Sequence, residues 1–417
     1  MKKSFYFFAC VLLLQIMQAR AQQLTSLNAL SYSGKTNLII ENKIFNTGGS
    51  NGALLYLVNC SDITIRNCIF KNAASIGIQI NASKNINIYG CLFDSVRTGV
   101  YATNCTGGLV INCNSFKDII GPRPRGQMVQ FNACTGAGNR INNNILDQTT
   151  GVGAPEDLVN LYASSGTVAD PIQVSGNKTR GGGPSTSGGG LMLGDNGSHD
   201  IIADNNILVN PGQYGIAAPS GWNMKITNNT VYSASFSYTN VGLYVGLSSE
   251  ITAGFACTGN TITVSGNKVN WKNKTNVQND FYYCACCPNV VNSGNTGKAS
   301  ITASILPTTL KLSNTCTNLN LNCSVLATAC PTVTDIEEEL SVDNQIVDWE
   351  IVNSILSATT KELSSWKLAC LDGRILYMVD NTQSIEASLE NYPDGIYMLI
   401  IQSPNQNTHI KFNYTYN

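Results

Sequence analysis

The sequence predicts an all-β chain, in which short parallel strands stack as the coils of a solenoid and a small antiparallel β-sandwich follows. The first observation is a repeated sequence motif, or phrase, that begins with Ile and ends with Phe. It occurs three times, at 65–70, 88–93 and 111–116. Both ends recur every 23 residues, and a fixed period of about 20 to 50 residues indicates a repeat architecture. The other two observations are a column of asparagines and a second strand motif that advances with it.

Extending the phrase in both directions gives three columns. The apolar column that opens each coil contains Ile40, Ile65, Ile88, Ile111, Ile141, Val174, Ile202, Ile226 and Val264. Three residues later come Lys43, Cys68, Cys91, Asn114, Asn144, Asn177, Asn205, Asn229 and Asn267. Five residues after the first column come Phe45, Phe70, Phe93, Phe116, Leu146, Thr179, Ile207, Val231 and Val269. An Asn at a corner can bond the Asn of the next coil and tolerates a left-handed backbone, so we expect an Asn ladder.

Each coil also contains a second strand, usually written as Gly, apolar, any residue, apolar. It occurs at 52–55, 77–80, 99–102, 128–131, 158–161, 190–193, 215–218 and 242–245. Alternate side chains of such strands point into a shared core, and stacked strands lie about 4.8 Å apart. Residues 22–305 are therefore predicted to form a parallel β-solenoid of about nine coils.

These coil phrases resemble those of the right-handed parallel β-helix proteins of the pectin-lyase-like superfamily, over roughly residues 25–300. The resemblance implies right-handed coils. It also implies a role with carbohydrates, since the superfamily includes polysaccharide lyases, glycoside hydrolases, epimerases and non-catalytic binding or adhesive proteins. The phrases are specific for the fold and say little about activity.

Composition and the N-terminus bear on location and partners. The net charge is −1 and only 12% of residues are charged, which argues against a nucleic-acid partner held through its phosphates. Lys2 and Lys3 precede an apolar run, and Ala19-Arg20-Ala21 is a small-x-small cleavage site, so residues 1–21 are predicted to be a signal peptide. We expect a monomeric bacterial protein that is secreted or held at the cell surface.

The character of the chain changes after the solenoid. Residues 306–335 are rich in Thr, Asn and Cys and are predicted to be a linker or cap, and 336–417 alternate like antiparallel strands with a turn at Asp372-Gly373. Gly373-Arg374 in this turn and the later Gly395-Ile396-Tyr397 strand resemble the Gly-Arg turn and the Gly-x-Tyr strand of the C-terminal sorting domain of the Bacteroidetes type nine secretion system, although the usual Tyr-Pro-Asn-Pro opening is missing. The resemblance implies the outer-membrane secretion machinery as a partner; the alternative is a plain β accessory module.

Cysteine and histidine usage limits the metal and disulfide chemistry. Cys68 and Cys91 occupy equivalent positions of adjacent coils, where each is either a small buried filler or half of a disulfide. The later cysteines favour disulfide or capping roles: Cys284, Cys286, Cys287, Cys316, Cys323 and Cys330. A zinc site is not expected, because the chain has two histidines and no paired C-x-x-C motifs.

Three consecutive coils carry long connections between the third column and the second strand. The connection is 7 residues from Phe70 to Gly77 but 12 from Phe116 to Met128, 12 from Leu146 to Leu158 and 11 from Thr179 to Gly190. Insertions in a solenoid gather on one face, often the binding face. We therefore expect a substrate groove about 14 Å long over these coils.

Candidate catalytic residues lie on these loops. Counting back from each second strand places Gln127, Asp157 and Tyr214 in one column. Asp157 is a candidate general base or metal ligand, or else a turn residue that caps its own loop. Arg125 and Arg180 are candidate clamps on an anionic sugar, or else solvated surface residues. Glu156 neighbours Asp157 in sequence, so we expect their side chains to diverge. The candidate substrate-binding residues are Glu156, Gln127, Gln130, Asn160, Tyr162, Asp195, Tyr214 and Tyr101.

Two reactions fit these residue types. Hydrolysis needs two carboxyl groups about 5 to 9.5 Å apart, and the plausible pairs are Asp157 with Asp195, with Asp147 or with Asp118. β-Elimination from a uronate needs a base and a cation, for which Arg125, Arg180 or a calcium ion would serve, and these candidates favour the lyase slightly. We therefore expect a lyase or glycoside hydrolase acting on an acidic polysaccharide; the alternative is a non-catalytic glycan-binding or adhesive surface protein.

Overall fold

The computed structural model describes residues 24–47, 52–246, 262–284, 290–319, 321–331, 346–352, 355–370, 375–389, 395–403 and 406–414. The chain divides into two compact units, residues 1–332 and 333–417. The expected signal peptide lies outside the described residues, as do Cys286 and Cys287. Within the described ranges, no helix combines the length and the apolar character needed to cross a membrane.

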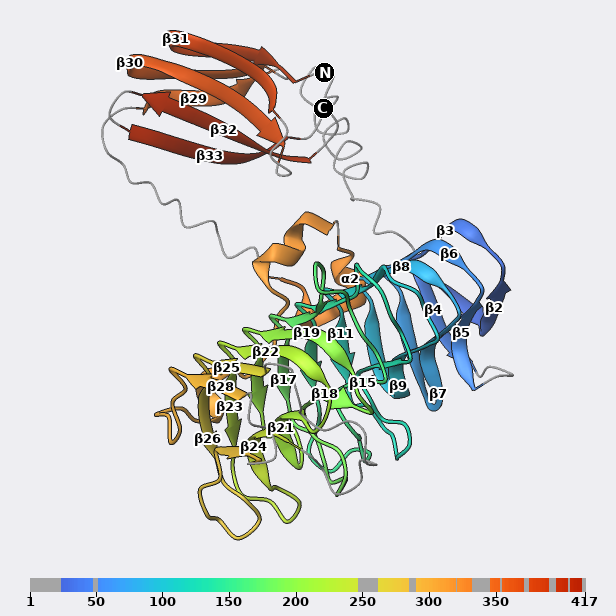
Figure 1. Cartoon of the computed structure of the whole chain (residues 1–417). Coiled ribbons are helices and arrows are strands. Elements are labelled where there is room, and N and C mark those ends of the chain that lie inside the picture. Colours follow the sequence, from blue (N-terminus) through green and yellow to red (C-terminus); the bar gives the residue numbers. More distant parts are fainter. Residues whose placement is uncertain are drawn as a thin grey trace, which may run out of the picture. The chain divides into compact units, whose positions relative to one another are not determined.

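The first unit is a right-handed parallel β-helix with three faces (Figure 1). The first face contains β1 (Thr25–Asn28), β4 (Lys43–Thr47), β11 (Ser115–Lys117), β14 (Ile145–Asp147), β17 (Lys178–Arg180), β20 (Ile207–Val209), β23 (Thr230–Ser233) and β26 (Lys268–Trp271). The second face contains β2 (Leu30–Ser33), β5 (Ala53–Val58), β12 (Val129–Asn132), β15 (Val159–Tyr162), β18 (Leu191–Asp195), β21 (Tyr214–Ala218), β24 (Val241–Val245) and β27 (Phe281–Tyr283). Two longer strands, β7 (Ile69–Asn81) and β9 (Leu92–Thr103), run through both faces.

The third face is a ten-stranded parallel sheet. Its strands are β3 (Thr36–Glu41), β6 (Ser61–Arg66), β8 (Lys84–Tyr89), β10 (Leu109–Asn112), β13 (Arg140–Asn142), β16 (Ile172–Ser175), β19 (His199–Asp204), β22 (Trp222–Thr227), β25 (Ile262–Ser265) and β28 (Val290–Ser293). Nine coils of the described chain supply all three faces, from β3–β4–β5 to β25–β26–β27. We number them coils 1 to 9, and their number confirms the prediction.

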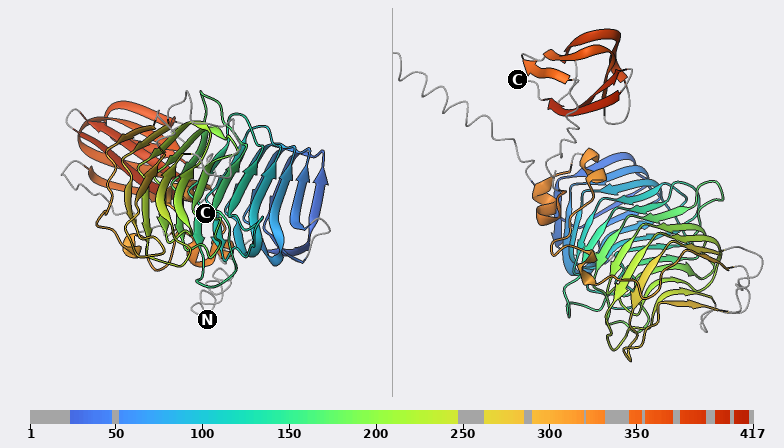
Figure 2. Two further views of the ribbon diagram at one scale, coloured as in Figure 1. Left: turned by 60° about the horizontal axis from the view of Figure 1, so that its bottom comes forward. Right: turned by 90° about the vertical axis from the view of Figure 1, so that its left-hand side faces the viewer.

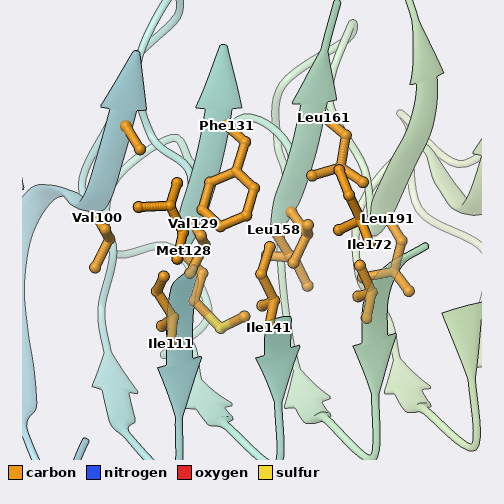
Figure 3. Close-up of a cluster of buried hydrophobic side chains, with 14 of the residues drawn as sticks. Val100, Ile111, Met128, Val129, Phe131, Ile141, Leu158, Leu161, Ile172 and Leu191 are labelled. Carbon is orange, nitrogen blue, oxygen red and sulfur yellow. The ribbon is translucent and has the colours of Figure 1, made fainter. Parts of the chain in front are cut away.

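The registers confirm the repeated phrase. Ile65 pairs with Ile88, and Ile88 pairs with Ile111. Figure 3 shows the apolar side chains of neighbouring coils pointing into the same interior. On the first face, the rings of Phe45, Phe70, Phe93 and Phe116 form a continuous stack with centroid separations of 4.9, 5.0 and 4.6 Å. The core is therefore a set of columns of like residues, one rung per coil.

The predicted Asn ladder is present at the corner between the third and first faces. Its side chains are buried at Asn114, Asn144, Asn177, Asn206, Asn229 and Asn267, and Asn295 continues the ladder. Each rung repeats the same pair of bonds: Asn144 Nδ2 donates to Asn177 Oδ1 at 3.1 Å and to the Ile111 carbonyl at 2.8 Å. At the bottom of the ladder, the Cys91 N–H donates to Asn114 Oδ1 at 3.0 Å.

In the seventh coil, each residue of the three predicted columns is one position later in the chain than expected. Ala203 pairs with Val174, and Leu208 rather than Ile207 takes the buried first-face position. The ladder residue is consequently Asn206, while the exposed Asn205 has φ of 54°. The left-handed backbone expected of the ladder asparagines belongs to the residue before each of them. In the first coil, Leu55 pairs with Ile78, so the second strand lies two residues later than predicted.

The cysteines separate into two groups. Cys60, Cys68, Cys91, Cys105 and Cys134 are buried free thiols, so Cys68 and Cys91 are fillers rather than a disulfide. Disulfides join Cys113 to Cys316 and Cys323 to Cys330. Cys284 is also disulfide-bonded.

Residues 299–331 return along the outside of the coils, and we call them the strap. They contain η1 (Ala303–Ile305), η2 (Asn314–Leu319), α2 (Cys323–Leu326) and η3 (Ala327–Ala329). Their contacts run in order from coil 9 back to coil 1: Ile301 bonds Asn270, Cys316 joins Cys113, and Asn322 bonds Asn67 and Asn42. Figure 2 shows this orange segment lying beside the blue strands of the first coils. The strap therefore spans about 38 Å of stacked coils.

The second unit is a five-stranded antiparallel sheet. Its strands are β29 (Ile346–Val352), β30 (Ile355–Cys370), β31 (Ile375–Ser388), β32 (Gly395–Ser403) and β33 (Gln406–Tyr414). The start of β30 pairs with β29, and its end pairs with β32. Leu356 from the first half and Trp366 from the second share one buried core, which gives the predicted sandwich. The predicted turn at Asp372-Gly373 lies outside the described residues.

Candidate functional site

The three long loops lie side by side across coils 4, 5 and 6, between β11 and β12, β14 and β15, and β17 and β18. Backbone bonds join them. The Glu156 N–H donates to the Gly126 carbonyl at 3.1 Å, and the Ala154 N–H donates to the Ile120 carbonyl at 2.8 Å. On the far side, the Gln213 N–H of coil 7 donates to the Gly188 carbonyl at 3.0 Å. The stacking of the coils thus brings residues from four separate stretches of chain together.

Asp157 is at the centre of this region, and only 3% of it is exposed. Its Oδ1 accepts hydrogen bonds from the Tyr214 hydroxyl and from the Gly189 N–H, the latter at 3.1 Å. Its Oδ2 accepts a hydrogen bond from Asn160 Nδ2 at 2.7 Å. Both oxygens are therefore satisfied by groups of the protein.

Burial raises the pKa of Asp157 to about 7, and the hydrogen bonds from Tyr214 and Asn160 offset part of that rise. Burial, together with the negative charge of Asp157, raises the pKa of the Tyr214 hydroxyl well above its ordinary value. Tyr214 therefore remains a donor to Asp157 at neutral pH. A carboxyl group whose pKa lies near neutrality can both hold and release a proton, which is the requirement for a general acid or base.

A glycine explains how Tyr214 reaches Asp157. The two residues share a column, as counted from the sequence, but they belong to coils 7 and 5. The column position in coil 6 is Gly189, where an added Cβ would lie 2.8 Å from the Tyr214 ring. The missing side chain lets the ring cross the intervening coil. Sequence reasoning overlooked Gly189, although counting the column through coil 6 would have found it.

Glu156 points away from Asp157, as expected of sequence neighbours, and contacts the third long loop. Its Oε1 accepts from the Ser187 hydroxyl at 2.7 Å, and its Oε2 accepts from the Ser185 hydroxyl at 2.9 Å. Glu156 is 7% exposed. Sequence reasoning missed both serines, and the signal available was their position in the middle of the Gly-rich run.

The predicted substrate-binding residues on the second face form one column along its outer side. Tyr101 pairs with Gln130, and Gln130 pairs with Asn160. All three are largely buried, and Gln130 Oε1 and Asn160 Oδ1 find no hydrogen-bond partner within the described part of the chain; the same holds for Gln127 Oε1. Tyr162 is more open, with 38% of it exposed.

Asn160 also connects Asp157 to Asp195. Its Nδ2 donates to Asp195 Oδ2 at 3.2 Å in addition to Asp157 Oδ2. These two oxygens are therefore at most about 6 Å apart, and the carboxyl groups of retaining glycosidases are about 5 to 5.5 Å apart. Asp195 is partly exposed at the end of β18, so the two acids differ in their access to solvent.

The two candidate arginines lie in different places. The Cζ of Arg125 is 4.0 Å from the centroid of the Tyr101 ring, a cation–π contact on the second face. Arg180 lies on the first face, where its guanidinium donates to the carbonyls of Pro307 and Thr308 in the strap and lies 3.6 Å from Asp147. Arg180 therefore fixes the strap and is not beside Asp157.

Metal ligands are sparse. Among the residues that the structure describes, no group of three or more His, Cys, Asp or Glu side chains is arranged to hold a metal ion. A calcium ion, considered from the sequence as a cation for elimination, thus has no such cluster to bind in the described chain.

Comparison with known proteins supports the fold. A family model described as the right-handed β-helix region matches residues 25–155. The crystal structure of PfbA, a surface adhesin of Streptococcus pneumoniae, is similar at 14% identity, over 66% of this chain and 72% of that chain, with a TM-score of 0.26. We draw no argument about function from so low a score. No curated protein matches the chain.

Proposed function

We propose that the protein is a secreted polysaccharide-active β-helix that binds a glycan on its second face and hydrolyses it with Asp157 and Asp195. The observation that carries this proposal is the bridge made by Asn160, whose Nδ2 donates to both carboxyl groups. The bridge limits the separation of the two bonded oxygens to at most about 6 Å, a limit compatible with the spacing of the carboxyl groups in retaining glycosidases. Asp157, with its pKa of about 7, is the acid that donates a proton to the leaving oxygen. Asp195, the more open group, is the nucleophile or base.

Hydrolysis fits the arrangement better than β-elimination. Elimination from a uronate needs cations beside the developing charge. Arg180 lies on another face, where it donates to carbonyls of the strap and lies beside Asp147. Arg125 remains on the second face and is the residue that would contact the carboxylate of an acidic sugar.

The glycan would lie along the outer column of the second face. Tyr101, Gln130 and Asn160 form its central part, and Tyr244 and Tyr282 continue the column in coils 8 and 9 with ring centroids 5.4 Å apart. Tyr282 is 49% exposed. Met192 and Ala217 occupy the same column in coils 6 and 7. The aromatic and amide groups of coils 3 to 5 and of coils 8 and 9 therefore form two patches, each suited to stacking and hydrogen bonding with sugar rings.

The test compares Asp157→Asn, Asp195→Asn and a control, Asp204→Asn, which lies on the third face. Each protein is incubated with neutral and uronate-containing polysaccharides, and new reducing ends and ultraviolet absorbance of unsaturated products are followed. We expect reducing ends without ultraviolet absorbance, a loss of about 100-fold or more in the first two variants, and unchanged activity in the control. Unsaturated products, or full activity of Asp157→Asn, would contradict the mechanism.

A non-catalytic glycan-binding or adhesive role is the second candidate. It is favoured by the burial of Asp157 and by the protein donors that already occupy both of its oxygens. Binding to a polysaccharide that yields no reducing ends from the wild-type protein would select this role.

We also propose that the second unit directs export through the outer-membrane secretion machinery and that residues 1–21 start the process. The support is the sequence resemblance of the C-terminal end together with its compact antiparallel sheet. A chain that stops at residue 332 should then remain in the periplasm while the full chain reaches the cell surface or the medium. Equal export of the two chains would contradict this role.

A further inference from the structure

The loop between Gly181 and Gly190, which we call the Gly loop, covers Asp157. Gly188 lies so close to Glu156 that an added Cβ would be 2.4 Å from the Glu156 carbonyl carbon, and the Gly189 N–H is bonded to Asp157. The middle of the Gly loop faces outward, since Pro184 and Thr186 are exposed. A ligand in solution therefore meets the Gly loop before it meets Asp157.

The ends and the middle of the Gly loop differ in how they are held. Gly181 and Gly190 are fixed by backbone bonds to coil 7, at 2.8 Å to the Val209 carbonyl and 2.8 Å to the Tyr214 carbonyl. Three consecutive glycines begin at the first anchor and three end at the second, so each end has backbone freedom that other residues lack. These are the positions at which a loop can hinge.

The middle is held by side-chain bonds to Glu156 and within the loop, where Ser185 Oγ accepts from the N–H groups of Ser187 and Gly188 at 3.3 and 3.2 Å. The hydroxyls of Ser185 and Ser187 both donate to Glu156, at 2.9 and 2.7 Å. Gln213 adds a bond from its Nε2 to the Thr186 carbonyl at 2.6 Å. Hydroxyl-to-carboxyl bonds exchange readily with water, because water solvates both groups well when the contact opens.

Three amide oxygens in the region of Asp157 lack donors within the described part of the chain. Asn160 Oδ1 next to Asp157, and Gln127 Oε1 and Gln130 Oε1 on the adjacent coil, are buried acceptors that no described residue satisfies. Buried acceptors are normally hydrogen-bonded. A ligand rich in hydroxyl donors would satisfy them.

We propose that the Gly loop is a lid, latched by Ser185 and Ser187 on Glu156, that opens to admit a hydroxyl-rich sugar unit to Asp157, Asn160, Gln127 and Gln130. The proposal rests on glycan binding at this site, and it explains how a buried acid gains access to a substrate. In the closed state the latch shields Asp157, and in the open state the sugar hydroxyls donate to the unpaired amide oxygens.

Hydrogen–deuterium exchange of the full chain tests the lid without any glycan, so the outcome is independent of whether the proposed hydrolysis is correct. The latch variant is Ser185→Ala with Ser187→Ala. The matched control is Thr186→Ala, because Thr186 is exposed and contributes its carbonyl, which the substitution keeps. We expect exchange of the peptide 181–190 to rise at least about tenfold in the latch variant and to stay unchanged in the control.

Two results would overturn the proposal. One is equal exchange of the peptide 181–190 in the latch variant and the control. The other is faster exchange in β13 and β16 of the latch variant, because the loop would then support the coils rather than cover a site. A second measurement, labelling with a water-soluble carbodiimide and glycine ethyl ester, should modify Asp157 several-fold faster in the latch variant; an unchanged rate also contradicts the lid.

Discussion

Removing the disulfide between the strap and the β-helix should destabilise the protein strongly. Cys113 and Cys316 are 203 residues apart, so their bond closes a loop that contains most of the β-helix. The chain-entropy relation gives about 5 kcal/mol for a loop of this size at 25 °C. We expect Cys113→Ser with Cys316→Ser to lower the free energy of unfolding of the β-helix by about that amount, measured by urea titration followed by circular dichroism.

The second described disulfide is an internal control for this estimate. Cys323 and Cys330 are 7 residues apart, and the same relation predicts a loss about 3 kcal/mol smaller when that pair is replaced by serine. Cys113 and Cys316 are buried whereas Cys323 is exposed, so burial adds to the effect of loop length in the long-range pair. A loss of unfolding free energy for the long-range pair that is equal to or smaller than the loss for the short-range pair would refute this explanation.

Three further perturbations test the core and the site. The pKa of Asp157 rises from 3.8 to about 7 on folding, so the folded protein is destabilised as the pH rises through this range. Between pH 4 and pH 8, the free energy of unfolding of the wild type should therefore fall by up to about 4 kcal/mol relative to that of Asp157→Asn. Parallel pH profiles of the two proteins in urea titrations would contradict this. Asn177→Ala removes a buried ladder rung and should cost about 2–4 kcal/mol of unfolding free energy, measured likewise. The control is Asn205→Gly, which should cost little because Asn205 is exposed and glycine keeps its left-handed backbone. Phe93→Ala interrupts the Phe stack and should cost about 3–5 kcal/mol; a melting temperature equal to that of the wild type would refute the packing role.

The fold was predictable because each coil repeats its neighbour. The 23-residue period is visible in Ile65, Ile88 and Ile111. In-register stacking places equivalent residues of successive coils in the same environment, so similar residues recur at equivalent positions. The slip in the seventh coil, Asn205 for Asn206, arose where two asparagines are adjacent. Sequence alone does not distinguish the residue that turns the corner from the residue that enters the ladder.

The candidate site was predictable only in part. Column counting correctly placed Asp157 and Tyr214 together, because register fixes which residues of successive coils are neighbours. The position of Arg180 could not be found this way. Its partners, Pro307 and Thr308, are 127 and 128 residues away in a segment without the repeat, and an outward-facing strand residue gives no sign of what covers it.

The strap changes where mechanical tension enters the β-helix. In a simple solenoid each coil contacts its two neighbours alone, so a pull on the C-terminal side would peel coils away from the last one inward. Here the chain leaves the first unit after the strap has bonded Asn67 and Asn42 in coils 2 and 1. A pull on the second unit would first strain these contacts and then the Cys113–Cys316 bond in coil 4. Coil 9 would be shielded until that covalent link had broken.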